Sequence, residues 1–77
     1  MQIGTRWAVG GEPPQSVPIA MRAAIDDEER TLAELGADTS GWRWTLTWLE
    51  GAPVVELDDG TTIRLGPDGD VRVSREG

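Results

Sequence analysis

Carboxylates and guanidinium groups are the abundant reactive side chains of this sequence, which has 14 acidic residues, seven arginines, and no histidine, cysteine, lysine or tyrosine. The missing types exclude an imidazole base, a thiol nucleophile, a lysine Schiff base, and histidine or thiolate metal ligands. The serine hydroxyls lack a base to activate them. Paired carboxylates hydrolyse glycosides, but such enzymes need a cleft that 77 residues scarcely provide. We therefore expect no enzyme activity, no catalytic residue and no cofactor.

Two acidic turns, Asp58-Asp59-Gly60 and Asp68-Gly69-Asp70, are the candidates for a metal site. Clustered carboxylates suit calcium, but neither turn has the alternating acids and the distant glutamate of an EF-hand loop. Consecutive hairpin turns lie at opposite ends of the strand that they share, so residues 61–65 hold these turns roughly 15 Å apart. Aspartate is also a common turn residue, because its side chain hydrogen-bonds the nearby backbone. The prediction is therefore turns, without a metal.

An acidic run is the first candidate for an interaction surface. It consists of Asp26, Asp27, Glu28 and Glu29, within a predicted helix. Four consecutive acids wrap around a helix, so at least one of them must approach its buried side. Such a run is usually a solvated face, and the alternative is docking on a basic partner or mimicry of a phosphate backbone. We also expect an i,i+4 ion pair between Asp26 and Arg30.

The outward face of a predicted sheet is the second candidate surface. It carries four arginines against one glutamate: Arg6, Arg43, Arg64, Arg72 and Glu56. Threonine, serine, alanine and valine fill the rest of this face. An arginine–threonine face suits a small anionic ligand, RNA or an acidic protein surface, although it has no aromatic side chain on which bases could stack. The alternative is that long arginine stems simply cover an open sheet and protect it from edge pairing.

A helix from about residue 17 to 35 must position the acidic run. Its buried stripe is predicted by apolar residues at helical spacing: Met21, Ile25, Leu32 and Leu35. Ser16 is expected to cap the first free amides, and Pro18 suits the first turn, where a missing N–H is no loss. Gly36 is expected to end the helix in a left-handed conformation.

Beyond residue 41 the apolar period changes from 3.6 to 2, which predicts strands that position the arginine face. The expected strands span residues 1–9, 42–49, 53–57, 61–65 and 71–74, separated by turns rich in Gly, Pro and Asp. Trp7, Trp42, Trp44 and Trp48 lie on the apolar sides of two strands. We expect them in the core, because the chain has no phenylalanine, with Trp42 near the strand end the most exposed.

Together these patterns predict one α+β domain over residues 1–77. One helix packs on a mostly antiparallel sheet of about five strands in the order β-α-β-β-β-β, with the first strand at an edge. The alternative is an SH3-like small barrel with an added helix, because four short hairpin-linked strands can curl.

The function expected from the sequence is a non-catalytic protein-interaction module. It would use the acidic helix side, the arginine sheet face, or both, with another protein as partner. The alternative is a binder of a small anionic ligand or RNA on the sheet face, and homo-oligomerisation through a sheet edge is a third interpretation. The net charge of −7 disfavours DNA. No signal-peptide pattern, apolar spanning stretch or cysteine is present, so we expect a soluble, cytoplasmic protein without a membrane partner.

Overall fold

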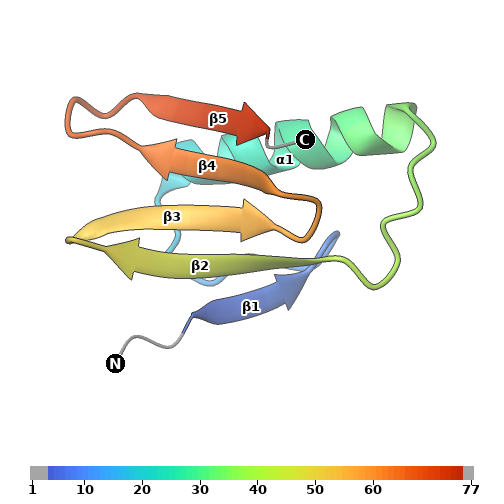
Figure 1. Cartoon of the computed structure of the whole chain (residues 1–77), viewed down its shortest axis with the longest axis horizontal. Helices are drawn as coiled ribbons and strands as arrows, with labels where there is room; N and C mark the ends of the chain where they lie inside the picture. Colours follow the sequence, from blue (N-terminus) through green and yellow to red (C-terminus); the bar gives the residue numbers. More distant parts are fainter. Residues whose placement is uncertain (1–3, 76–77) are drawn as a thin grey trace.

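Five antiparallel strands form one sheet in which each strand pairs with its neighbour in the sequence (Figure 1). The computed structural model describes residues 4–75. Its elements are, in order, β1 (Thr5–Ala8), α1 (Ile19–Glu34), β2 (Arg43–Leu49), β3 (Ala52–Leu57), β4 (Thr61–Leu65) and β5 (Val71–Arg75). The predicted α+β fold and its element order are confirmed. Because β1 and β5 lie at opposite edges of an open sheet, the barrel alternative is wrong.

The first strand is shorter than the sequence pattern suggests. It begins at Thr5, and residues 1–3 of the predicted strand lie outside the described part of the chain. The other four strands differ from their expected bounds by one residue at most at each end. Alternating polarity and turn residues therefore located the strands well, as expected for a half-buried antiparallel sheet.

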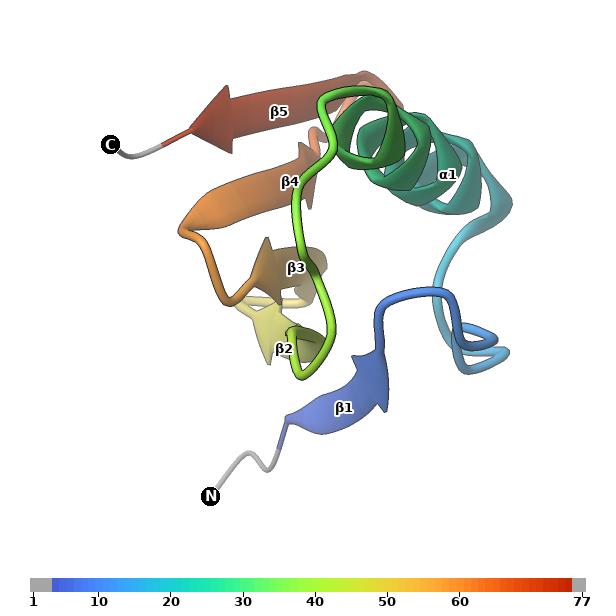
Figure 2. The same ribbon diagram turned by 90° about the vertical axis from the view of Figure 1, so that its right-hand side faces the viewer.

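The helix covers only one face of the sheet, and it lies beside β4 and β5 (Figures 1 and 2). The connection between β1 and α1 runs along the same side (Figure 2). Within residues 4–75, no helix is both long and apolar enough to span a membrane. Because α1 lies on one side only, the opposite face of the sheet is not covered by any element of residues 4–75, and its side chains are exposed or half-buried.

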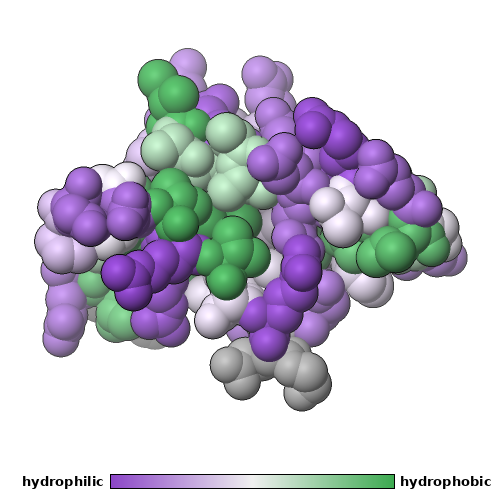
Figure 3. All heavy atoms as spheres, turned by 90° about the horizontal axis from the view of Figure 1, so that it is seen from above, coloured by the Kyte–Doolittle hydropathy of each residue, from purple (hydrophilic) through white to green (hydrophobic). Residues whose placement is uncertain are grey.

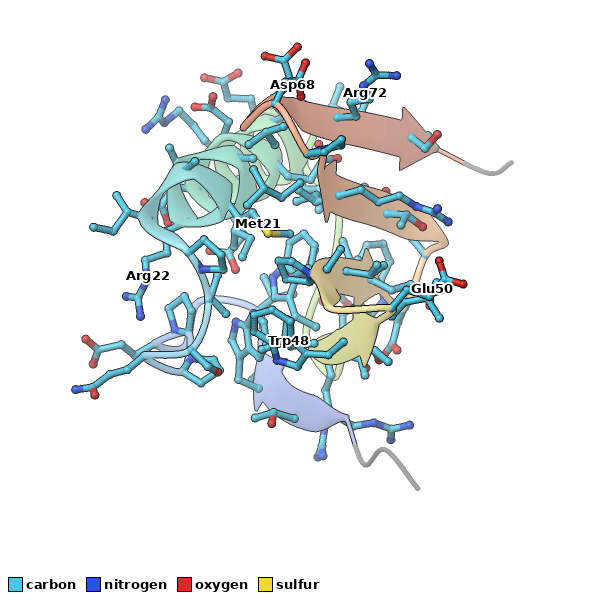
Figure 4. The ribbon with its side chains drawn as sticks, turned by 90° about the vertical axis from the view of Figure 1, so that its left-hand side faces the viewer. Met21, Arg22, Trp48, Glu50, Asp68 and Arg72 are labelled. Atoms are coloured by element: carbon cyan, nitrogen blue, oxygen red, sulfur yellow. The ribbon has the colours of Figure 1, made fainter. Side chains whose placement is uncertain are left out.

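The core forms between this helix side and the inward positions of the strands. Its buried apolar residues are Trp7, Val17, Met21, Ile25, Leu32, Trp44, Leu46, Val55, Leu57 and Ile63. Trp7 and Trp44 are partners in the β1–β2 register, and their rings stack with centroids 6.5 Å apart. Met21 of α1 lies between the helix and the sheet (Figure 4). Two tryptophans thus supply the bulk that the chain otherwise lacks.

The other two tryptophans reverse the expected order of exposure. Trp42 is partly buried and packs against the core, whereas Trp48 is 39% exposed. Trp48 pairs with Pro53 near the turn of the β2–β3 hairpin, beyond the part of the sheet that α1 covers. The prediction that Trp42 is the most exposed is therefore wrong, because Trp42 packs against the core whereas α1 does not cover the end of β2 at Trp48.

The start of the helix also differs from expectation. Pro18 occupies the N-cap position without any side-chain cap, and Ser16 lies in a turn that Val17 closes by donating to the carbonyl of Pro14 (3.0 Å). Val17 is 2% exposed. The predicted Ser16 cap is wrong because burial of Val17 folds this segment into a turn before the helix begins.

The end of the helix follows the predicted glycine signal. Gly36 has φ of 72° and donates to the carbonyl of Ala33, while Ala37 donates to that of Leu32. This pair of hydrogen bonds is the Schellman motif. Leu35, expected in the buried stripe, is instead 75% exposed, because it is the last residue before this reversal.

Replacing Gly36 isolates the conformational requirement of this helix end. A Cβ at position 36 would meet no atom within 4 Å, so only the left-handed backbone opposes a side chain. We expect Gly36→Ala to lower the free energy of unfolding by about 1 kcal/mol in urea denaturation. A synthetic chain with D-alanine at this position should be at least as stable as the natural one. Equal stability of the L-alanine variant would contradict this account.

Candidate functional site

The candidate site is the open face of the sheet, on the side away from α1, which we call the outer face. One row of paired residues crosses all five strands on this face: Arg6, Thr45, Glu56, Thr62 and Ser74. A second row contains Thr47, Val54, Arg64 and Arg72. A third pairs Ala8 with Arg43. The tryptophan pair Trp7–Trp44 occupies the alternate register positions, so the arginines and the core tryptophans lie on opposite faces.

The four arginines of the outer face form two pairs. Arg64 and Arg72 lie directly opposite each other on β4 and β5. Arg6 and Arg43 are diagonal neighbours on β1 and β2, because Arg6 pairs with Thr45 and Arg43 with Ala8. The two pairs are roughly 15–20 Å apart, given the strand spacing and the rise per residue. The structure therefore brings these arginines together in twos, at opposite corners of one face.

The outer arginines are exposed, and none of them forms an ion pair within residues 4–75. The other three arginines all have partners. Arg22 donates to the carbonyls of Pro14 and Val17, at 2.7 and 3.1 Å. Arg30 pairs with Asp27, and Arg75 pairs with Glu28. Positive charge without a partner is thus concentrated on the outer face.

A hollow of about 400 Å³ lies next to Arg64 and Arg72 on the outer face. Its apolar lining comes from the hairpin ends: Leu49, Ala52, Pro53, Val54, Leu65 and Pro67. Glu50 stands at the β2–β3 turn, and in Figure 4 both it and Arg72 lie away from the helix side of the sheet. Glu50 and Gly51 have φ of 53° and 80°, as a tight type I′ turn requires. The hollow is therefore framed by short, defined turns.

The sequence pattern did not identify the apolar part of this hollow. Leu49 follows Arg43, Thr45 and Thr47 at a period of two, which places it on the outer face. That spacing is a signal that could have been used. Ala52 is its partner across the hairpin. The contribution of Pro67 could not have been found, because it depends on how two separate turns come together.

The acidic run divides between the fold and the solvent. Glu28 is 5% exposed, and its carboxylate accepts from Nη2 of Arg75 at 2.6 and 2.8 Å and from Nε at 3.2 Å. These hydrogen bonds and the charge of Glu28 hold the pKa of Arg75 above its usual value. Arg30 pairs with Asp27 at 3.3 Å, so the predicted Asp26–Arg30 pair is wrong. Asp26 and Asp27 are the exposed members of the run.

Glu29 joins three segments of the chain. Its Oε2 accepts from the indole Nε1 of Trp44 at 2.9 Å and from the backbone N–H of Gly10 at 3.1 Å. Trp44 is fully buried, so this bond satisfies a donor that water cannot reach. Glu29 is therefore a structural residue that ties α1 to β2 and to the loop after β1.

Three aspartates of the turns accept hydrogen bonds from the backbone. Asp58 accepts from the N–H of Arg43, Asp59 from that of Thr61, and Asp68 from that of Asp70. In the loop after α1, hydrogen bonds from the hydroxyl and the N–H of Ser40 hold the pKa of Asp38 below its usual value. Among residues 4–75, no group of three or more acidic side chains is placed to hold a metal ion.

Comparisons with known proteins leave the outer face to be interpreted from its own chemistry. No protein family, no curated protein and no solved structure matches this chain.

Three substitutions test whether Glu29, unlike Asp26, contributes to the stability of the fold. Glu29→Ala leaves the buried indole N–H of Trp44 without an acceptor, so the free energy of unfolding should fall by about 1–3 kcal/mol. Glu29→Gln keeps an acceptor oxygen, so its free energy of unfolding should fall by less. Asp26→Ala, on the same helix, should change the free energy of unfolding by no more than about 0.5 kcal/mol. Equal effects of Glu29→Ala and Asp26→Ala in urea denaturation would show that the Trp44 bond contributes nothing.

Proposed function

We propose that this chain is a non-catalytic protein-interaction module that binds an acidic segment of a partner protein across its outer face. The observation that carries this proposal is the set of four exposed arginines without an ionic partner among residues 4–75. The protein has twice as many acidic as basic residues, so the lack of ionic partners for these arginines is not due to a shortage of carboxylates. Like charges directly opposite on neighbouring strands, as at Arg64 and Arg72, also destabilise a sheet. A face that retains this destabilising pair of like charges is suited to binding an anion from outside the molecule.

The spacing of the arginines favours an extended segment over a single compact anion. Two pairs that are roughly 15–20 Å apart cannot both contact one small molecule, whereas an extended chain of about five or six residues spans that distance. Guanidinium groups bind carboxylates through two parallel hydrogen bonds, which adds geometric specificity. An acidic polypeptide segment therefore fits the whole face.

RNA fits the outer face less well. Single-stranded RNA is usually recognised by stacking of bases on aromatic side chains. The tryptophans Trp7 and Trp44 are buried on the other face of the sheet, and the outer rows contain none. A small anionic ligand has one observation in its favour, which is the hollow beside Arg64 and Arg72.

The acidic side of α1 has a smaller part in the proposal than the arginine face. Glu28 and Glu29 make contacts within the molecule, and Asp27 pairs with Arg30 at the surface, which leaves Asp26 for a basic partner. The proposal keeps a cytoplasmic location, which the cysteine-free sequence supports.

Binding of a defined acidic peptide tests the proposal directly. We expect acetylated, amidated hexaglutamate to shift ¹H–¹⁵N NMR signals of the outer strands, and Arg43→Gln/Arg64→Gln/Arg72→Gln to weaken its affinity by at least about tenfold. Arg30→Gln removes one charge on the helix, and its affinity should stay within about twofold of the natural protein. The single variant Arg64→Gln is its matched comparison. The same variants would then be used to capture partners from cells of the native host.

Two outcomes would count against the outer face as the binding surface. One is equal affinity of the triple variant and the natural protein for the peptide. The other is an equal loss in Arg30→Gln and Arg64→Gln, because that result would reflect the overall charge alone.

A further inference from the structure

Arg64 and Arg72 are cross-strand partners on β4 and β5, and both side chains project from the outer face. The N–H of Gly66 donates to the carbonyl of Asp70 at 2.7 Å, which makes this the first hydrogen-bonded pair after the turn. Hydrogen-bonded pairs alternate along an antiparallel ladder, so Arg64 and Arg72 form the next one, with Cα atoms about 5.5 Å apart. Two long, rotatable arginine side chains that start from Cα atoms this close can both reach one carboxylate or two neighbouring ones.

The hollow beside these arginines adds an apolar surface to the charged one. Its volume of about 400 Å³ is within the range of sites that hold small molecules or single anchoring side chains. Leu49 is 56% exposed, and Val54 is the register partner of Arg64 on the neighbouring strand. An apolar group in this hollow would therefore lie next to an anion held by the arginines.

A second hollow with charged lining lacks this combination. It lies between α1 and β5, where Figure 3 shows apolar surface gathered over both elements. Its charged residues include Glu28 and Arg75, which already pair with each other at 2.6 Å. Val73 is exposed there, but no unpaired arginine accompanies it. Charge complementarity therefore favours the hollow at Arg64 and Arg72.

We infer that this hollow takes one apolar side chain of the acidic segment, while a neighbouring carboxylate of that segment binds Arg64 and Arg72. The inference rests on the proposed function, and it names the sequence feature that the partner must have: an apolar residue next to an acidic one. Glu50, at the far end of the hollow, repels a second acid there. The carboxylate is consequently directed to the arginine side, which gives the segment one orientation.

Two peptides of equal charge separate the apolar anchor from general attraction. The probes are acetylated, amidated Glu-Glu-Leu-Glu-Glu and Glu-Glu-Ser-Glu-Glu, titrated into the ¹⁵N-labelled protein. We expect the leucine peptide to bind roughly tenfold more tightly, because its leucine side chain is transferred from water into the apolar hollow. Its largest signal changes should include Leu49 and Val54. Leu49→Thr/Val54→Thr should remove this preference and keep the affinity for the serine peptide, whereas Arg64→Gln/Arg72→Gln should weaken both peptides.

The comparison of peptides on the natural protein needs no variant to fold. Equal affinity for the two peptides overturns the inference and leaves the proposed function standing. Binding of neither peptide overturns both. Leucine-dependent signal changes confined to the hollow between α1 and β5 overturn the inference. So does tighter binding of free octanoate than of the leucine peptide, because the site would then serve a small organic acid.

Discussion

Burial of Trp44 is the interaction on which the rest of this structure depends. The side chain is fully buried, stacks on Trp7 of the neighbouring strand, and donates to Glu29 of the helix. It thereby joins β1, β2 and α1 and decides which face of the sheet turns inward. Because side chains alternate along each strand, that choice also places every arginine of β1, β2 and β4 on the opposite face.

The charges of the protein are divided between structure and surface by the same arrangement. Helix acids that face the core side meet a donor from another element: Glu28 binds Arg75 of β5, and Glu29 binds the indole of Trp44. Such bonds satisfy polar groups where water is excluded. On the outer face no element of residues 4–75 packs against the sheet, so the side chains of Arg64 and Arg72 are exposed. The uneven distribution of partners is therefore a consequence of covering one face of a sheet with one helix.

The outer face combines a rigid frame with adaptable side chains. Each inner strand is hydrogen-bonded to a neighbouring strand on both sides, and each edge strand on one side. Short turns that contain Glu50 and Pro67 border the hollow. Arginine stems are long and rotate freely, whereas the hydrogen-bonded backbone beneath them is fixed. A frame of this kind orders little of its own backbone when an anion binds, which limits the entropic cost of recognition.

The sequence by itself determined the elements and the faces of the sheet. The period of two, the turn residues and Gly36 act over a few neighbouring residues, so they predicted the strands, the helix end and the outward arginines. Only the tertiary structure decided which acids are structural, since Glu28 meets Arg75 across 47 residues and Glu29 meets Trp44 across 15. It also decided the exposure of Trp48 and the shape of the hollow. These features depend on contacts between distant segments, which no local pattern encodes.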